Sequence, residues 1–523
     1  MVWEPGRGSI VRRGKGLLLA LLVPVVLTGC TAGPSRRPAV VENDARSAPT
    51  AGVPSTVPLP PLTEPRSPSV QWSDCDTQVR SRLEPPSVPA SALSFTCATV
   101  TSVLDSPDLP GRIPTHVALL KAGSGPIPLL VLNDIEGESG THYAAHLAAA
   151  LPPALLSRFS LIGVDRRGTG DSDAVGCVPR DVRTTLLSQD PAADEIDEVL
   201  DAARRAGQQC AIDLGNSQLA IDSWRAAGDL EQIRVQLGVP KLNAIAHGEA
   251  SHVLTSYAAR YPGRFGRVVL DGIPDPSPDP ATALADLTAA RQSTLDAFGR
   301  DCADRRCGLG DATAAVTTLL DRLRADQPML GDGTAFSPGL ALDAITVGLA
   351  NPARWPELAT AIQAAGGGNP APLAAFVDPM LHGSQAAPPR LDGALATECN
   401  DSSARLSANQ ITALGTRLRQ QSALFGAAAT ERLTWCLPWP GRTTPLPPPG
   451  VAGLPPILVT ATASDPVTPE PGTTRAAAQM PSAVRISWQG SGHAAFTSPC
   501  VGEAVRAFLA DGKVPADGTL CPA

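Results

Sequence analysis

Basic residues are in deficit in this 523-residue sequence, and they nowhere form a block. Lys plus Arg number 42 against 50 Asp plus Glu, a net charge of −8 that argues against nucleic acid as a partner. No Cys-x-x-Cys pair or Cys/His cluster has the spacing of a zinc site. We therefore expect no metal and no other cofactor. Few aromatic residues together with 53 Pro and 47 Gly are typical of a loop-rich protein.

The N-terminus has the features of a bacterial export signal. Basic residues precede the apolar run Gly16–Leu27, which is too short to span a bilayer as a permanent helix. The run ends in Leu27-Thr28-Gly29-Cys30, which resembles a lipobox whose cysteine is lipidated. The alternative is an ordinary cleaved signal with a chance cysteine. We expect a signal peptide over 1–30, a Pro/Ser-rich tether over 31–69, and anchoring to the outer face of the cell membrane.

The remaining ten cysteines form an even set, for which disulfides are the default in an exported protein. The sequence does not fix their connectivity. Pairing of close neighbours predicts five local bridges: Cys75–Cys97, Cys177–Cys210, Cys302–Cys307, Cys399–Cys436 and Cys500–Cys521.

Buried strand patterns alternate with helical patterns in two parts of the chain, 70–275 and 445–523. This alternation predicts an α/β fold with a mostly parallel, doubly wound sheet. Between the two parts, 276–444 is mostly helical with Gly and Pro breaks. We interpret that block as a helical cap over the carboxyl edge of the sheet.

The segment Leu242–Ser251 has the pattern of a nucleophile elbow, in which a strand turns sharply into a helix between small residues. The usual pattern is Gly-x-Ser-x-Gly, and here it reads Ala-His-Gly-Glu-Ala. Gly248 stands at the apex, where a serine oxygen would be required.

Several motifs around the elbow make the chain resemble the secreted prolyl and tripeptidyl aminopeptidases of the α/β-hydrolase family. The resemblance covers about 72–521 and implies a Ser-Asp-His triad that hydrolyses peptides or esters. The motifs are Val164-Asp165-Arg166-Arg167-Gly168-Thr169-Gly170-Asp171-Ser172, Asp229-Leu230-Glu231-Gln232-Ile233-Arg234, Leu237-Gly238, Lys241-Leu242-Asn243 and Val269-Leu270-Asp271-Gly272.

The resemblance places the acid at Asp465 and the base at His493, in the chain order of α/β-hydrolases. The nucleophile position is Gly248. Two residues are alternative nucleophiles. Ser251 lies about 4.5 Å further along the helix, and Glu249 would require the elbow to slip by one residue.

The loop that helps to bind the oxyanion in this family also departs from its pattern. Its first glycines are replaced by Asp134 and Ile135, and Glu136 and Glu138 add negative charge. Glu249 follows the elbow apex, where its backbone N–H would be the second donor. We assign Ile135, Glu136 and Glu249 to the oxyanion region, and we expect the surrounding acids to oppose a developing negative charge.

Histidines at His142, His146, His247 and His252 could hold a metal, but they lack the His-Glu-x-x-His frame, and we interpret them as satisfied surface or core residues. The function predicted is that of an exported lipoprotein with a hydrolase fold and impaired chemistry. It would bind a peptide or small ligand, or a partner in the cell envelope. The alternative is an active exopeptidase or esterase with an unrecognised nucleophile.

Overall fold

A computed structural model of the protein describes residues 57–83, 88, 93–107, 109–111, 113–277, 279–383, 388–402, 404–440, 446–493 and 495–523. The expected signal peptide, Cys30 and the first part of the expected tether lie outside these residues. No helix within the described ranges is both long and apolar enough to cross a bilayer.

One ten-stranded sheet organises residues 73–521, in the order β1-β2-β3-β5-β4-β6-β7-β8-β9-β10. The strands from β4 onwards are parallel to one another, whereas β1, β2 and β3 join the sheet in antiparallel pairs. This order, with β5 inserted between β3 and β4, is the predicted α/β-hydrolase fold. The strands are β1 (Ser73–Asp74), β2 (Phe95–Val103), β3 (Pro114–Ala122), β4 (Ile127–Leu132), β5 (Phe159–Val164), β6 (Leu242–His247), β7 (Phe265–Asp271), β8 (Ile457–Ser464), β9 (Ala483–Ser491) and β10 (Thr519–Cys521).

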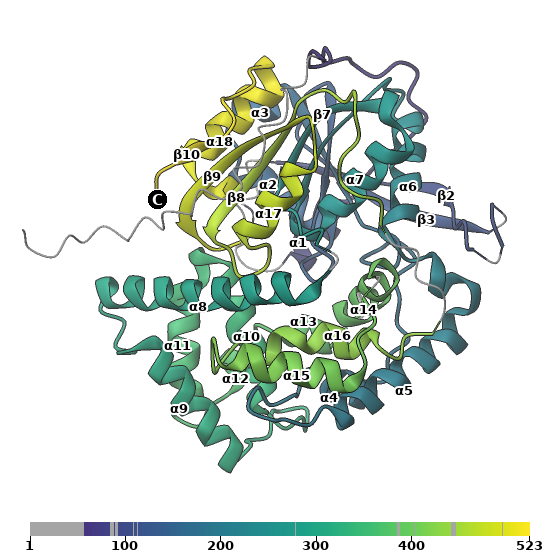
Figure 1. Ribbon diagram of the computed structural model, residues 1–523. Coiled ribbons are helices and arrows are strands. Elements are labelled where there is room, and N and C mark those ends of the chain that lie inside the picture. Colours follow the sequence, from purple (N-terminus) through teal and green to yellow (C-terminus); the bar gives the residue numbers. More distant parts are fainter. Residues whose placement is uncertain are drawn as a thin grey trace, which may run out of the picture. The chain divides into compact units, whose positions relative to one another are not determined.

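The central strands are buried on both faces, which explains their unbroken apolar sequences. Along β4, Leu130 and Leu132 pack on one face, whereas Leu129 and Val131 pack on the other. The first face is covered by α6 (Ser223–Gln236), α7 (Ser251–Arg260) and α17 (Glu470–Ala478). The second is covered by α1 (Asp76–Arg82), α2 (Gly140–Ala150), α3 (Pro153–Leu156) and α18 (Pro499–Arg506) (Figure 1).

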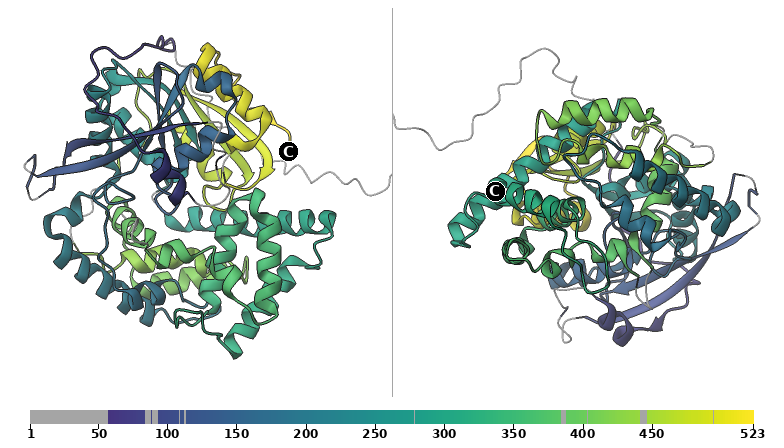
Figure 2. Two further views of the ribbon diagram at one scale, coloured as in Figure 1. Left: turned by 180° about the vertical axis from the view of Figure 1, so that it is seen from behind. Right: turned by 90° about the horizontal axis from the view of Figure 1, so that it is seen from below.

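Helices of the cap gather on one side of the sheet, in the lower part of Figure 1 and of the left view of Figure 2. Most of their buried side chains form a separate hydrophobic cluster, whereas Leu414 and Leu418 belong to a smaller one. The cap helices are α8 (Pro280–Arg305), α9 (Ala312–Ala325), α10 (Pro338–Ala350), α11 (Trp355–Gly366), α12 (Ala371–Ala374), α13 (Asp378–Leu381), α14 (Arg390–Asp401), α15 (Ala408–Arg419) and α16 (Glu431–Cys436).

The cap layer is larger than the block 276–444 expected from the sequence. Helices α4 (Arg180–Leu186) and α5 (Asp197–Leu214), which follow β5, pack into the same hydrophobic cluster as the cap. The Trp435 indole of α16 donates a hydrogen bond to the Leu186 carbonyl at 3.2 Å. The sequence of an amphipathic helix does not show which layer the helix packs against. We therefore placed this segment in the sheet part of the chain, 70–275.

We expected 31–69 to be a tether. Its last part, 57–69, instead packs on the sheet domain. The Arg66 N–H donates to the Gly238 carbonyl at 2.8 Å, and the Ser69 N–H donates to the Gln236 carbonyl at 2.8 Å. The Arg267 guanidinium donates to the Pro60 carbonyl at 3.1 Å. Backbone groups of a polar, Pro-rich segment bind this surface although its composition is that of a linker.

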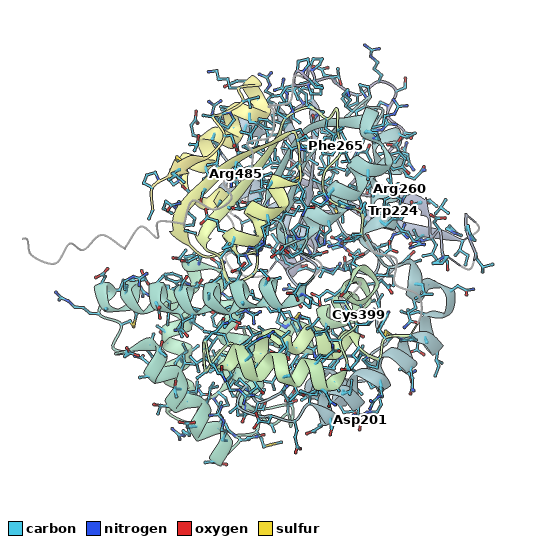
Figure 3. All side chains as sticks on the ribbon, in the orientation of Figure 1. Asp201, Trp224, Arg260, Phe265, Cys399 and Arg485 are labelled. Carbon is cyan, nitrogen blue, oxygen red and sulfur yellow. A yellow bond between two sulfur atoms is a disulfide. The ribbon has the colours of Figure 1, made fainter. Side chains whose placement is uncertain are left out.

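All five local disulfides are confirmed. Cys399, which Figure 3 labels, lies in α14 and bonds Cys436 of α16. In the sheet domain, Arg260 of α7 lies 5.1 Å from the centre of the Trp224 ring and thereby joins α7 to α6 (Figure 3).

Candidate functional site

The elbow forms at the end of β6. The strand ends at His247, a short 3-10 turn covers Gly248–Ala250, and α7 begins at Ser251. Gly248 has φ +58°, a left-handed conformation that side chains rarely adopt and that glycine adopts without strain. A Cβ placed on Gly248 would lie only 2.2 Å from the Asp134 carboxylate. The space where a serine side chain would begin is therefore filled by Asp134.

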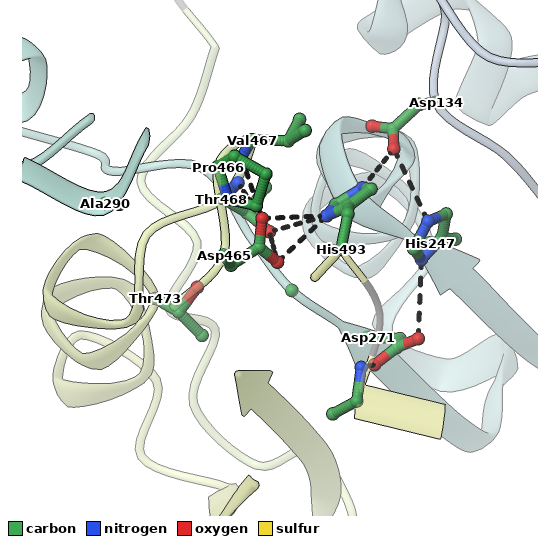
Figure 4. Close-up of polar contacts among 12 residues, drawn as sticks. Asp134, His247, Asp271, Ala290, Asp465, Pro466, Val467, Thr468, Thr473 and His493 are labelled. Atoms are coloured by element: carbon green, nitrogen blue, oxygen red, sulfur yellow. Dashed lines mark hydrogen bonds and ion pairs between the residues drawn. The ribbon is translucent and has the colours of Figure 1, made fainter. Parts of the chain in front are cut away.

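Asp465 and His493 meet at the carboxyl edge of the sheet, directly beyond β8 and β9 (Figure 4). His493 Nδ1 lies 2.9 and 3.0 Å from the two Asp465 oxygens. The Asp465 carboxylate is fixed by the N–H groups of Val467 and Thr468, both at 2.8 Å. Acid and base thus have the mutual geometry of a hydrolase triad.

The other ring nitrogen of His493 faces Asp134. His493 Nε2 lies 2.5 Å from Asp134 Oδ2 (Figure 4). The Glu249 N–H donates to Asp134 Oδ1 at 2.5 Å. In an α/β-hydrolase these two groups serve the serine hydroxyl and the oxyanion. Both are engaged by one carboxylate that comes from the loop after β4.

The oxyanion donor expected from the loop after β4 is engaged as well. The Ile135 N–H donates to Glu249 Oε2 at 3.3 Å. The Glu249 carboxylate is held in turn by the Arg166 guanidinium, at 2.5 and 3.2 Å. Arg166 follows β5, is buried, and also donates to Ser223 Oγ at 2.9 Å. Two carboxylates of the chain therefore occupy the two backbone donors.

The pKa values of His493 and Asp134 are shifted by the charges of their neighbours. Burial lowers the pKa of the His493 imidazole, but Asp465 and Asp134 outweigh burial and hold that pKa well above its ordinary value. Burial raises the pKa of Asp134, but the two histidines and the Glu249 N–H bring it below its ordinary value. The two carboxylates therefore favour the protonated form of His493, and His493 in turn favours the ionised form of Asp134.

A second histidine faces the same carboxylate. His247 Nε2 lies 3.7 Å from Asp134 Oδ2, and His247 Nδ1 lies 3.4 Å from Asp271 Oδ2. The ring centres of His247 and His493 are 4.2 Å apart (Figure 4). Tyr143 of α2 stacks on His247, with a centroid distance of 5.2 Å.

Glu136 and Glu138 do not act on the oxyanion donors as the sequence led us to expect. Glu136 pairs with Arg432 of the cap, and Glu138 lies 2.9 Å from His146 Nδ1. Each acid has a positively charged or ionisable partner within reach, so only Asp134 and Glu249 bind the donors. The sequence could not show these pairings, because Arg432 lies almost 300 residues away from Glu136.

Neither alternative nucleophile is placed to react. Ser251 is fully buried, and its hydroxyl donates to the Gly272 carbonyl at 2.6 Å. Glu249 is bound by Arg166 and Ile135, as described above. The structure instead brings Asp134 beside His493, a contact that the sequence analysis did not foresee. Its only signal was an acid where the family has glycine.

A cavity of about 550 Å³ opens beside Asp134. The loops after β4 and β5 line one side of it, with Asn133, His142 and Arg166. The cap lines the other side, with Pro389 and Gly393. A ligand bound there would touch both layers and the Asp134 carboxylate.

Comparisons with known proteins agree with this architecture. The sequence profile of the family described as TAP-like protein matches residues 421–521. The chain is 26% identical to the serine protease Hip1 of Mycobacterium tuberculosis over 482 residues, which covers 86% of this chain and 91% of Hip1. It is 24% identical to the tripeptidyl aminopeptidase of Streptomyces lividans, over 74% and 75% of the two chains. The chain is similar to the tripeptidyl-aminopeptidase-like α/β-hydrolases.

Among solved structures, a thermophilic esterase from Thermogutta terrifontis is 14% identical, with a TM-score of 0.37 and coverage of 79% of this chain and 98% of the esterase. That overlap is low, and the fold assignment rests on the strand order described above.

Proposed function

We propose that this tripeptidyl-aminopeptidase-like protein has lost serine-hydrolase chemistry and binds a peptide in the cavity between the sheet and the cap. The observation that carries the proposal is the Asp134 carboxylate, which lies over Gly248 and contacts both His493 Nε2 and the Glu249 N–H at 2.5 Å.

Loss of chemistry follows from what acyl transfer requires. A nucleophile must approach the carbonyl carbon while backbone N–H groups stabilise the developing oxyanion. Gly248 offers no nucleophile, and the N–H groups of Glu249 and Ile135 already bind carboxylates. A tetrahedral oxyanion would have to displace Asp134 and would then face its negative charge.

Binding of a peptide is supported by the cavity and by the relatives. The cavity of about 550 Å³ is within the range of small-molecule sites and is lined by both layers. One relative is named a tripeptidyl aminopeptidase, and another a serine protease. Peptides are therefore the ligand class to test first.

Export and lipid attachment are part of the same proposal. Five disulfides are typical of a protein that folds in an oxidising compartment. The lipobox-like Leu27-Thr28-Gly29-Cys30 would attach the chain to the outer face of the membrane. A role as a binding partner in the envelope follows from that location.

One observation favours a second candidate, an active hydrolase with Asp134 as its nucleophile. Asp134, His493 and Asp465 form a continuous array in which a carboxylate replaces the serine hydroxyl. Attack by Asp134 on an acyl carbonyl would release the leaving group and form a mixed anhydride, which water would hydrolyse. The hydrogen bond from Glu249 N to Asp134 weakens this candidate, because the nucleophile occupies the oxyanion donor.

Activity assays separate the two candidates. Wild-type protein should turn over neither peptide anilides nor short-chain esters, and a fluorophosphonate probe should not label it. Hydrolysis that is lost in both Asp134→Asn and His493→Ala would establish the second candidate and overturn the first.

Peptide binding requires its own measurement. Fluorescence anisotropy with a labelled tripeptide library should detect binding, and His142→Trp should weaken it by filling the cavity. Ile212→Trp is the matched control, because Ile212 on α5 is 75% exposed. Absence of binding to the wild-type protein, or equal effects of both variants, would contradict the proposal.

A further inference from the structure

Three polar side chains converge above Gly248 in an arrangement that peptide binding does not require. Asp134, His247 and His493 each offer one ligand atom, and these atoms lie within 4.8 Å of one another. His493 Nε2 is 2.5 Å and His247 Nε2 is 3.7 Å from Asp134 Oδ2. Figure 4 shows both rings directed at the same carboxylate.

We infer that Asp134, His247 and His493 form a binding site for a divalent first-row transition ion. The ion would take the place of the proton between His493 Nε2 and Asp134 Oδ2, and that proton would be released to solvent. Two imidazoles and one carboxylate are a ligand set that such ions use when further positions stay open. Metal–ligand distances of about 2.0 to 2.2 Å place ligand atoms roughly 3.3 Å apart in a tetrahedron. The distances from Asp134 Oδ2 to the two histidine nitrogens, 2.5 and 3.7 Å, lie below and above that value, so small side-chain movements would complete the site.

The groups behind the histidines support the same conclusion. Metal-binding histidines almost always place their other ring nitrogen against a carboxylate or carbonyl, which fixes the ring. Here His493 Nδ1 is 2.9 Å from Asp465, and His247 Nδ1 is 3.4 Å from Asp271. Asp271 is itself held by the Thr460 hydroxyl at 2.6 Å. His493 is therefore fixed by Asp465, whereas Asp271 lies next to His247 Nδ1 at a distance that a small ring movement would shorten to a hydrogen bond.

Gly248 makes the third ligand possible. Any side chain at this position would begin 2.2 Å from Asp134 and would push the carboxylate away from both histidines. The loss of the serine and the entry of Asp134 are thus one structural change, which replaces a nucleophile by a ligand. The cavity beside Asp134 leaves room for water or a bound molecule at the open positions.

A second group, Glu249, His252 and Asp401, also brings its potential ligand atoms within 4.8 Å of one another. It is the weaker candidate because the Arg166 guanidinium binds Glu249 at 2.5 Å and would repel a cation. His252 therefore provides a matched control, a histidine in a comparable cluster one turn beyond the elbow.

The test is titration of the EDTA-treated full-length protein with Co²⁺, read by its visible ligand-field absorption, and with Zn²⁺ in competition. We expect one equivalent to bind. His247→Ala and Asp134→Ala should abolish binding, and Asp271→Asn should weaken it about 10- to 100-fold. His252→Ala should leave the affinity unchanged. Because the readout is spectroscopic, the result does not depend on whether the protein hydrolyses or binds peptides.

Gly248→Ala tests the geometry without removing a ligand. It should weaken Co²⁺ binding, whereas Gly310→Ala should not, since Gly310 has a similar φ of +73° in open space. Melting temperatures and disulfide mapping identify variants that fail to fold. The inference is overturned if the wild-type protein binds no Co²⁺ or Zn²⁺, if binding survives in folded His247→Ala and Asp134→Ala, or if His252→Ala abolishes it instead.

Discussion

The Asp134 carboxylate accepts a hydrogen bond from the Glu249 N–H at 2.5 Å, across 115 residues of sequence. A reciprocal bond runs from the Ile135 N–H to the Glu249 carboxylate at 3.3 Å. The acid of the loop after β4 thus binds the N–H group of the elbow, and the acid of the elbow binds the N–H group of that loop. A serine placed at the elbow would leave these bonds intact, which determines how activity should respond to mutation.

Gly248→Ser alone should give no measurable peptidase activity, because its Cβ would meet Asp134 and the Glu249 N–H would remain occupied. The double variant Asp134→Gly/Gly248→Ser removes that carboxylate. It should exceed the single variant by about 100-fold, the effect of one oxyanion donor. Initial rates on peptide anilides and fluorophosphonate labelling measure the difference. Equal rates would show that Asp134 does not block the site.

Stability should fall as the pH rises toward neutrality because of Asp343 in the cap. Burial raises the pKa of Asp343 to about 7 from 3.8, against the attraction of Arg432 and Arg291 and with repulsion from Glu136. The folded chain therefore keeps a proton that the unfolded chain loses. The stabilisation is fully present below pH 3.8 and declines until about pH 7.

Asp343→Asn should remove this slope, since the amide does not titrate. The shift from 3.8 to about 7 sets an upper limit of about 4 kcal/mol on the change, which partial exposure reduces. Urea unfolding between pH 5 and about pH 8 measures it. The neighbouring Glu431, whose pKa burial also raises well above its ordinary value, remains in both proteins. Parallel curves for the two proteins would refute the assignment.

The buried pair Arg167–Asp229 should dominate the local stability around β5. Arg167 donates to both Asp229 oxygens at 2.6 and 2.8 Å and to the Leu104 and Ala220 carbonyls. Arg167→Ala leaves a buried carboxylate unpaired, at a cost of about 3 to 5 kcal/mol in unfolding free energy. Arg204→Ala, which breaks an exposed pair with Asp201, should change stability by less than about 0.5 kcal/mol. Similar losses in both variants would contradict this.

The proposed lipidation of Cys30 predicts where the protein should appear when cells are fractionated. Wild-type protein should sediment with membranes, whereas Cys30→Ala should appear in the soluble fraction, because the lipid supplies the attachment. Mass spectrometry should find the acyl chain on Cys30 and the ten other cysteines in their five local bridges. Membrane association that persists in Cys30→Ala would refute the anchor.

The fold was predictable because its signals are local. Unbroken apolar strands such as Ile127–Leu132 and the small-residue turn around Gly248 identify the sheet and the elbow directly. Asp465 and His493 were identified by resemblance, and the structure brings them into contact. The sequence did not show which groups block the nucleophile position and the oxyanion donors. It depends on which way Asp134, Glu136 and Glu249 point, and the decisive contacts join residues more than 100 positions apart.

His247 illustrates the same limit. From the sequence we interpreted it as a satisfied surface or core histidine. Its partners, Asp134 and Asp271, come from the ends of two other strands. Only the strand order brings these three ends together, so no spacing along the chain reveals the cluster.

One backbone contact extends the site beyond the sheet. The His493 N–H donates to the carbonyl of Ala350, the last residue of α10, at 2.7 Å, and the adjacent Gly492 packs so closely on Pro352 that a Cβ would lie 2.4 Å from it. The loop that carries His493 therefore packs directly on the end of α10 in the cap. A molecule that displaces the end of α10 should therefore also shift the loop that carries His493, and with it the contact of the imidazole with Asp134.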